Sequence, residues 1–284
     1  MNEETLRDAI EEAARSSGEY RTITFEQTRH LAEAFGSVRD VELAALAMEI
    51  VPERYVRNLG TIGVDGQLKL LQASVAIVGL GGLGGYVAEA LARLGVGHLV
   101  LIDGDTFEEH NLNRQLLSHE DNLGVEKATA ACQRVAQVNG AVATTGHAVV
   151  LTGENLPRLL EGADVVVDAL DRLPTRLVLQ DGAQALGIPM VHGTIGGFLG
   201  QVMTIFPEDP GLHALYGDGA GLPEQGLESE LGTPAATPMA VAAWEAQEVV
   251  KIVTGRGDLV RNRLLILDME SGTAQTLELG AAGD

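Results

Sequence analysis

The chain has 284 residues, of which 45% are hydrophobic and 35 are glycine. This composition excludes a disordered chain and predicts a globular protein with one large α/β domain and a small appendage. Lys and Arg number 19 against 40 Asp and Glu, which gives a formal net charge of −21. Such an acidic chain repels phosphate backbones and anionic lipids, so nucleic acid and membrane surfaces are not expected as partners.

The sequence contains a single cysteine, Cys132. It therefore forms no disulfide within the chain, and a cysteine zinc cluster is excluded. The N-terminus, MNEETLRDAI, lacks the basic and then apolar pattern of a signal peptide, and no apolar run reaches the roughly 18 residues that span a bilayer. We expect a soluble cytoplasmic protein whose acidity mainly serves solubility.

Residues 1–50 are expected to form a small helical appendage. Thr24 and Gln27 have the spacing of a capping box, and Gly36 suits the end of the helix that follows. A second helix is expected over residues 37–50. Two short helices joined by Gly-Ser also fit a helix-turn-helix, but the segment has no basic face, so packing against the main domain or a second subunit is favoured.

Residues 51–284 are expected to form the main domain, because strands and helices alternate from about residue 72. This pattern predicts an α/β fold with a Rossmann-like, mainly parallel sheet covered by helices on both faces. Residues 196–206 and 262–279 read as later, antiparallel strands. Between them, residues 207–238 are expected to form a long mobile loop, and the following helix should end at Gly255.

A glycine-rich turn follows the first strand of the main domain and opens a helix. Gly79, Gly81, Gly82 and Gly84 fit the pattern G-x-G-x-x-G, whose backbone approaches phosphate closely at a helix N-terminus. Asp103 ends the next strand, where a carboxylate can accept hydrogen bonds from a ribose. These residues predict a nucleotide site, but they do not distinguish NAD from ATP.

Two cations follow the ribose carboxylate closely. Arg114 and Lys127 have no use in hydride transfer, whereas transfer of a nucleotidyl group builds negative charge that fixed cations stabilise. Asp168 and Asp171 lie just past another strand, at the sheet edge where ligands bind. One carboxylate there is expected to hold a metal ion, while Asp168 is expected to be a structural carboxylate at the strand end.

Five segments stand out by their order and spacing. They are RYVRNLGTIGVDGQLKLLQASVAIVGLGGLG, LVLIDGDTFEEHNLNRQLL, GVEKA, VVVDALDRLPTR and GQVMTIF. Together they resemble the ThiF/MoeB/HesA family over roughly residues 54–280, a family that shares a catalytic domain with ubiquitin-activating enzymes. The resemblance implies ATP-dependent adenylation of the C-terminal glycine carboxylate of a small ubiquitin-like sulfur-carrier protein ending in Gly-Gly, with release of pyrophosphate.

The resemblance also implies roles for single residues. Asp103 would hold the ATP ribose, with Asp105 in the same nucleotide-binding loop. Asn111, Arg114 and Lys127 would contact the phosphates, with the two cations stabilising the transition state. Asp171 would bind Mg²⁺. Arg57 matches an arginine that reaches the ATP of the opposite subunit, which implies a homodimer.

The chain departs from the family at three places. The stretches 209–215 and 267–271, where many relatives carry zinc-binding C-x-x-C pairs, contain no cysteine, so no zinc is expected and His213 alone is not a site. Residues 224–238 also lack the cysteine that some relatives use for a thioester or persulfide, and Cys132 is expected to be buried packing. The chain should therefore stop at the acyl-adenylate. Arg172 stands where relatives often have Asn, beside the metal-binding Asp171.

Three alternatives remain open from the sequence. An NAD(P)-dependent oxidoreductase would explain the glycine turn but leave Arg114 and Lys127 idle. A nucleotide-binding regulatory or scaffold protein that has lost catalysis is compatible with the missing cysteines. Activation of a free acid, such as a peptide, would replace the carrier. The pathway, whether thiamine, molybdenum or tungsten cofactor, cysteine or another sulfur product, is not named by the sequence.

Overall fold

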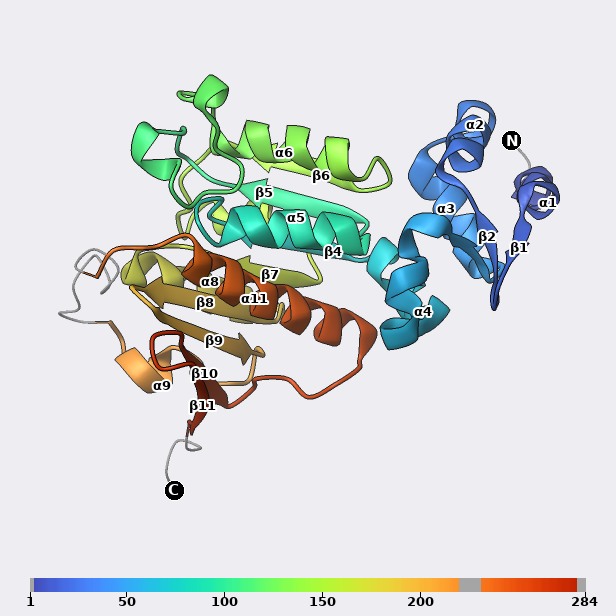
Figure 1. Ribbon diagram of the computed structural model, residues 1–284. Coiled ribbons are helices and arrows are strands. Elements are labelled where there is room, and N and C mark those ends of the chain that lie inside the picture. The colour runs from blue at the N-terminus through green and yellow to red at the C-terminus, as the bar shows by residue number, and fades with distance from the viewer. Residues whose placement is uncertain (1–2, 220–230, 280–284) are drawn as a thin grey trace.

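The computed structural model describes residues 3–219 and 231–279 (Figure 1). Its main feature is an eight-stranded sheet with the order β11-β10-β9-β8-β7-β4-β5-β6. Strands β8, β7, β4, β5 and β6 run parallel, and β9, β10 and β11 are added antiparallel. This confirms the predicted fold class. The strands are β4 (Ser74–Val78), β5 (His98–Ile102), β6 (Ala143–His147), β7 (Val165–Asp168), β8 (Met190–Gly196), β9 (Leu199–Ile205), β10 (Arg263–Asp268) and β11 (Thr273–Glu278).

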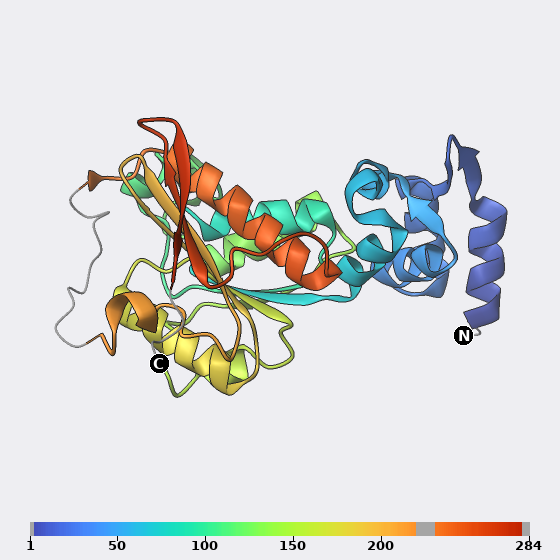
Figure 2. The ribbon, with the colours of Figure 1, turned by 90° about the horizontal axis from the view of Figure 1, so that it is seen from below.

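Helices cover both faces of this sheet (Figure 2). The helices α5 (Gly84–Leu94), α6 (Lys127–Val138) and α11 (Ala236–Thr254) pack on one face, and α7 (Leu156–Leu159) and α8 (Leu173–Ala185) on the other. Alternate side chains of the central strands enter the two cores: Val165 and Val167 join the first, and Val166 the second. Near-continuous apolar runs such as Val165–Val167 are required where both faces of a strand are buried.

The ends of these helices follow local rules. Helix α5 ends at Gly95 and α11 at Gly255, both left-handed, with φ of 80° and 68°. Glycine adopts this conformation without steric penalty, and the turn it makes satisfies the last helix carbonyls. The predicted stop at Gly255 is therefore confirmed.

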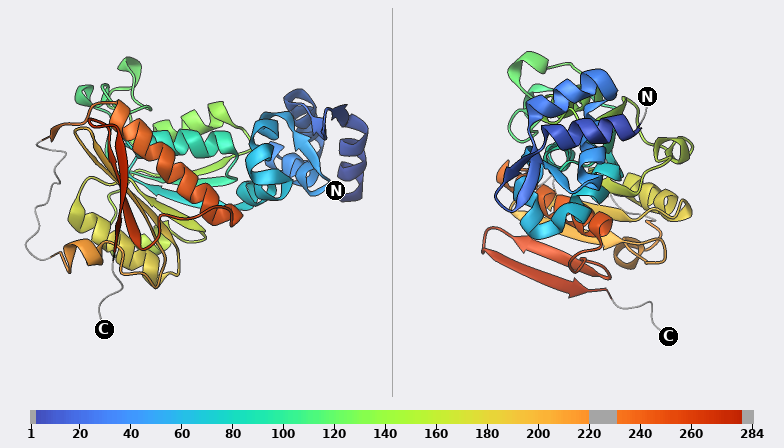
Figure 3. Two further views of the ribbon diagram at one scale, coloured as in Figure 1. Left: turned by 60° about the horizontal axis from the view of Figure 1, so that its bottom comes forward. Right: turned by 90° about the vertical axis from the view of Figure 1, so that its right-hand side faces the viewer.

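Residues before the large sheet form a separate small unit, seen at one end of the molecule in Figure 2 and in the left view of Figure 3. Its sheet has the order β1-β2-β3, a topology that a purely helical appendage lacks. The helical description of this region was therefore incomplete. The elements are α1 (Glu3–Ala13), β1 (Arg15–Ser17), β2 (Tyr20–Ile23), α2 (Phe25–Phe35), α3 (Val38–Ala47) and β3 (Ile50–Pro52).

The capping predictions for this unit are confirmed, but one boundary is wrong. Thr24 and Gln27 form the capping box of α2, and Gly36 ends that helix. Helix α3 stops before residue 50, because Glu49 takes a positive φ of 58° and Ile50 pairs in the small sheet. Since β3 spans residues 50–52, a domain boundary at residue 50 stays a prediction.

The unit is joined to the main domain by buried polar contacts. The Tyr55 hydroxyl donates to the Glu42 carboxylate at 2.9 Å, and Arg39 donates to the Leu71 carbonyl at 3.1 Å. Tyr55 lies in the 3₁₀ helix η1 (Glu53–Asn58), which leads into α4 (Leu59–Gln72). The appendage therefore packs against the domain through its third helix.

Part of the region 207–238, which was expected to be a loop throughout, is helical. It contains α9 (His213–Tyr216), and α11 begins at Ala236, inside the predicted loop. Residues 220–230 of that loop lie outside the described residues, so its predicted mobility stays a prediction. None of the described helices combines the length and apolarity that crossing a bilayer requires.

Candidate nucleotide-binding site

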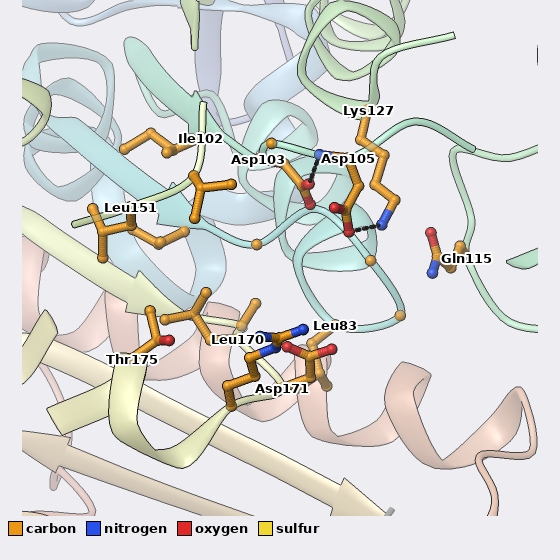
Figure 4. Close-up of a pocket in the computed structure, with 18 of the residues that line it drawn as sticks. Leu83, Ile102, Asp103, Asp105, Gln115, Lys127, Leu151, Leu170, Asp171 and Thr175 are labelled. Carbon is orange, nitrogen blue, oxygen red and sulfur yellow. Dashed lines mark hydrogen bonds and ion pairs between the residues drawn. The ribbon is translucent and has the colours of Figure 1, made fainter. Parts of the chain in front are cut away.

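A cavity of about 520 Å³ opens at the C-terminal edge of β4, β5 and β7 (Figure 4). It lies beside the neighbouring parallel strands β4 and β7, because the chain runs from β4 through β5 to β6 on one side and then returns to β7 on the other. Open α/β sheets bind ligands at such a reversal of strand order. Residues from both sides of the reversal line it. The predicted site residues among them are Gly79, Gly81, Gly82, Asp103, Asp105, Arg114, Lys127 and Asp171.

The glycine-rich turn forms the floor of the cavity. Gly79 has a φ of 91°, and a Cβ there would lie 2.5 Å from the Ala169 carbonyl oxygen. Gly81 and Gly82 line the cavity itself. Gly84 does not line it; a Cβ at Gly84 would overlap the Gly79 carbonyl, so this glycine permits the turn to close on α5. The motif thus combines phosphate access with tight packing.

Asp103 links the glycine turn to the loop after β5. One carboxylate oxygen accepts the Leu80 N–H at 2.7 Å, and the other accepts the Asp105 N–H at 2.8 Å. A carboxylate has about four acceptor positions, so lone pairs remain for a ribose diol. Burial raises the pKa of Asp103, and the neighbouring Lys127 charge opposes that rise. The side chain is held rigidly where the resemblance implies a ribose.

Lys127 is buried at the start of α6 and is already paired. The ammonium group of Lys127 lies 3.0 Å from an oxygen of the exposed Asp105 side chain. The backbone N–H of Lys127 donates to the Asp105 carbonyl. The close-up shows Asp103, Asp105 and Lys127 together on one side of the cavity (Figure 4). A buried cation held by one exposed carboxylate is available to a phosphate that displaces that partner.

Arg114 enters the cavity from the loop after the 3₁₀ helix η2 (Glu109–Asn111). Its guanidinium donates to the His110 carbonyl at 2.9 Å and to the Asn113 side chain at 2.8 Å. Burial lowers the pKa of Arg114, and the carboxylate of Asp171 opposes this effect. An arginine stays charged at any ordinary pH, so it supplies a fixed cation facing Asp171.

Asn111 lies outside the cavity lining. Its side-chain oxygen accepts the Glu108 N–H at 3.0 Å and so closes the turn that carries Arg114. Its contact with phosphate stays a prediction.

Asp171 and Arg172 form the opposite wall, in the loop between β7 and α8. Both side chains are exposed and line the cavity, and neither makes a hydrogen bond or ion pair within residues 3–219 and 231–279. The described residues contain no group of three or more His, Cys, Asp or Glu placed to hold a metal ion. Mg²⁺ at phosphate sites usually takes one or two carboxylates and completes its shell with phosphate oxygens and water. A lone, accessible Asp171 fits that pattern.

Arg57 is not part of this cavity. It is exposed on η1, and it makes no hydrogen bond or ion pair within the described part of the chain. Its neighbour Arg54 is occupied, because it hydrogen-bonds Asn139, pairs with Glu42 at 3.5 Å and lies 5.1 Å from the centre of the Phe25 ring. Of the two, Arg57 is the arginine whose side chain makes no contact of these kinds with a described residue.

A buried polar group behind the cavity was missed from the sequence. Arg176 lines the cavity from α8, and its guanidinium hydrogen-bonds the Leu170 carbonyl. Asp168 and His192 are fully buried and joined at 2.7 Å. Glu245 on α11 is buried without a hydrogen-bond partner among the described residues. Of these residues, the sequence had singled out Asp168 alone, as a structural carboxylate at the end of β7, and its burial agrees with that prediction.

The predicted packing of Cys132 is partly supported. The side chain is half-buried on α6 and packs against the first core, close to Gly146. His213 lies outside the cavity lining, with its ring between the Asp181 carboxylate and the Gly217 carbonyl.

A doubly wound sheet with a glycine turn, a ribose-type carboxylate and fixed cations at its switch point defines a nucleotide-binding α/β protein. Residues 55–283 match the ThiF family. The SAMP-activating enzyme E1 of Haloferax volcanii is 35% identical over 230 residues, which are 79% of this chain and 84% of that protein. The chain therefore belongs to the ThiF family, and it is an adenylyltransferase, not an oxidoreductase.

Other relatives are longer than this chain. The adenylyltransferase and sulfurtransferase MOCS3 of Drosophila sechellia is 36% identical over 231 residues, which are 77% of this chain and 49% of that protein. A MOCS3-2 protein of Zea mays is 34% identical, over 80% of this chain and 48% of the relative. The chain thus spans about half the length of these two proteins.

Solved structures show the same fold. E. coli MccB, crystallised with ATP, has a TM-score of 0.68 at 23% identity and covers 81% of this chain and 71% of its own. PaaA has a TM-score of 0.66 at 22% identity and covers 80% and 73%. At this identity the likeness concerns the architecture alone.

Proposed function

We propose that this protein uses ATP to adenylate the C-terminal glycine carboxylate of a small ubiquitin-like sulfur-carrier protein ending in Gly-Gly, and releases pyrophosphate. The observation that carries the proposal is the convergence of Asp103, Lys127, Arg114 and Asp171 on one cavity beside the glycine-rich turn. The relative named SAMP-activating enzyme E1 and the resemblance to sulfur-carrier enzymes support the choice of a carrier.

In the proposed reaction, a carboxylate oxygen of the carrier attacks the α-phosphorus of ATP. The new C–O–P bond forms as the bond from the α-phosphorus to the bridging oxygen breaks, and pyrophosphate leaves with that electron pair. No proton is transferred, so the protein needs no general base. Its task is to place the reactants and to stabilise negative charge.

Each wall of the cavity has a part in this task. The free lone pairs of Asp103 would accept hydrogen bonds from the ribose, and the turn at Gly81 and Gly82 would admit the phosphates. Lys127 would leave Asp105 for the departing pyrophosphate, and Arg114 would stabilise the equatorial oxygens. Asp171 would hold Mg²⁺, which neutralises phosphate charge when bound.

Residues 232–235, called the strap below, precede α11 and would border the entrance for the carrier tail. Thr233 lines the cavity, and its carbonyl accepts a hydrogen bond from Asn113 at 3.2 Å. Gly197 donates to the Gly232 carbonyl at 2.8 Å, and Thr237 donates to the Gly197 carbonyl at 2.8 Å. A glycine tail has no side chains to exclude, so it suits a passage under such a strap.

We also propose that the working form is a homodimer in which Arg57 reaches the partner's nucleotide. The exposure of Arg57 and its lack of a hydrogen bond or ion pair with any described residue support this. In an isologous dimer, each site would then combine Arg114 of one subunit with Arg57 of the other.

A mixing experiment tests the chemistry and the dimer together. Arg57→Ala and Arg114→Ala should each abolish pyrophosphate–ATP exchange that depends on a Gly-Gly-tailed carrier, because each removes a cation from the transition state. Mixing the two variants as refolded subunits should restore about a quarter of wild-type activity, since half the dimers are mixed and each then holds one intact site. The control is Arg158→Ala, an exposed arginine on α7 outside the cavity.

The outcomes separate the parts of the proposal. Retained exchange in Arg114→Ala would contradict the assigned chemistry. Loss in both variants without recovery on mixing would contradict the role of Arg57 across the dimer. If a short free peptide supported pyrophosphate exchange as well as the folded carrier does, the substrate would be a peptide acid and not a carrier protein.

A further inference from the structure

The loop that carries Asp171 into the cavity is held by buried side chains at Leu170. Its N–H donates to one oxygen of Asp168 at 3.1 Å, and its carbonyl accepts from the guanidinium of Arg176. Both backbone polar groups of Leu170 are thus satisfied by charged side chains that are almost wholly buried, at 0% exposed for Asp168 and 6% for Arg176. Such charge-assisted contacts are stronger than hydrogen bonds between neutral groups.

Asp168 is itself fixed from behind. Its second oxygen lies 2.7 Å from Nδ1 of His192, the residue paired with it in the parallel register of β7 and β8. A carboxylate accepts, so the Nδ1–H of His192 donates. His192 is 1% exposed and sits on a central strand, so the carboxylate has no freedom to turn away from Leu170.

The loop also abuts the glycine-rich turn. The Ala169 N–H donates to the Val78 carbonyl at 2.9 Å, and a Cβ on Gly79 would lie 2.5 Å from the Ala169 oxygen. The two backbones are therefore in contact, and a shift of the 169–172 loop would displace the phosphate-binding turn as well.

Asp171 has no such support of its own. Its side chain forms no hydrogen bond or ion pair with a residue in the described ranges, so its place at the cavity is set through the backbone of the loop, with Leu170 directly before it. We propose that Asp168, His192 and Arg176 are positioning residues that hold Asp171 where a phosphate-bound Mg²⁺ requires a carboxylate. The purpose given to Asp171 rests on the proposed function, whereas the clamp on Leu170 does not.

Hydrogen exchange of the backbone amides tests the clamp without any activity. His192→Leu and Arg176→Met each remove one support, so the hydrogen-bonded amides of residues 169–172, those of Ala169 and Leu170, should exchange about tenfold faster than in the wild type. His192→Asn places an amide donor near the former Nδ1 position and should restore the slow exchange. The matched control is Thr204→Val, which removes a buried hydrogen bond of 2.6 Å to Glu248 on a neighbouring part of the sheet.

A second measurement tests the consequence for the site. With pyrophosphate exchange as the assay, His192→Leu should raise the Mg²⁺ concentration for half-maximal activity about tenfold, and His192→Asn should stay near the wild type. Thr204→Val should leave that concentration unchanged, because a general loss of folded enzyme lowers the maximal rate and does not move the Mg²⁺ midpoint.

Three results would overturn the proposal. Unchanged exchange at residues 169–172 in both His192→Leu and Arg176→Met would show that the clamp does not hold the loop. Faster exchange throughout the chain, equal to that of Thr204→Val, would assign the network to overall stability. Local acceleration with an unmoved Mg²⁺ midpoint would separate the loop from metal binding. Absence of carrier-dependent exchange in the wild type would contradict the proposed function and leave the amide result standing.

Discussion

The two walls of the cavity are organised differently. On the wall formed by β5 and α6, Asp103, Asp105 and Lys127 are bonded to one another and to the glycine turn. On the wall formed by β7 and α8, the side chains of Asp171 and Arg172 have no hydrogen bond or ion pair within the described residues. The fixed contacts of this wall lie behind them, between Leu170 and the buried side chains of Asp168 and Arg176. On the first wall, the side chains that would touch the nucleotide are themselves held by hydrogen bonds. On the second wall, the backbone that carries Asp171 is held, and its side chain is not.

This difference has a chemical reason. Groups that meet the ribose and phosphates must be in place before binding, because reorganisation during the reaction raises the barrier. A carboxylate that would take a metal ion needs open lone pairs, so hydrogen bonds from the protein would compete with its ligand. Support through the backbone leaves the Asp171 carboxylate free while limiting its movement.

Removal of Lys127 should give the largest effect and would test the first wall. Lys127→Ala deletes the buried cation that lies 3.0 Å from Asp105. We expect the kcat of pyrophosphate exchange to fall about 10²-fold or more, as when one electrostatic group of a transition state is lost. Steady-state exchange kinetics measure this. Lys69→Ala, an exposed lysine paired with Asp65 on α4, is the control; a loss in Lys127→Ala no greater than in that control would contradict the assignment.

Asp103→Asn should give a smaller effect, confined to nucleotide affinity. The amide keeps one acceptor for Leu80 or Asp105 but loses the charge and an acceptor for the ribose. We expect the Kd for ATP, measured by calorimetry, to rise about tenfold, equivalent to about 1.4 kcal/mol. Asp164→Asn is a matched control, since Asp164 accepts the Ser74 N–H at 2.8 Å at the opposite end of the sheet. An unchanged Kd for ATP with a reduced kcat would show that Asp103 acts in the reaction and not in nucleotide binding.

The first wall could be predicted from the sequence, and much of the second could not. Strand ends of a parallel sheet meet at one edge, so Gly79, Asp103 and Asp171 were placed together by their positions after apolar runs. The short strands β1 and β6 were missed, because RSS and ATTGH are polar and largely exposed and carry no alternating apolar pattern. Their pairing depends on neighbours distant in the sequence.

The buried ionisable side chains behind the cavity had no local signal. Arg176 and Glu245 sit on helices at positions where charged residues usually face solvent. Their burial arises from tertiary packing: a Cβ on Gly193 would overlap the Glu245 carboxyl group, so the space for Glu245 exists because the facing strand residue is glycine. The burial of Arg176 and Glu245 therefore cannot be predicted from the residues next to them in the sequence.

The smallest effect on the site is expected for Glu245, whose ionisation concerns the stability of the fold and its dependence on pH. Burial, and then the charge of Asp168, raise the pKa of Glu245 well above its usual value, and Arg176 opposes them. The carboxyl has no hydrogen-bond partner among the described residues. Below the unfolded pKa, Glu245 is protonated in both states and its contribution to stability is complete. As the pH rises, only the unfolded chain releases the proton, so stability should fall by about 1.4 kcal/mol per pH unit until the folded pKa is reached.

Glu245→Gln removes this titration while keeping the shape of the side chain. We expect the free energy of unfolding of the wild type, relative to that of the variant, to decline in denaturant titrations as the pH rises above the usual pKa of a glutamate. Because Glu245 lies on α11, across the sheet from the Asp168–His192 pair, the variant should leave the hydrogen exchange of residues 169–172 unchanged at pH 6. A stability difference independent of pH would mean that Glu245 is ionised in the fold. Accelerated exchange of that loop would mean that the support of the second wall extends through the sheet to α11. The two walls would then differ less, because the second would depend on the packing of the whole sheet and not on the contacts at Leu170.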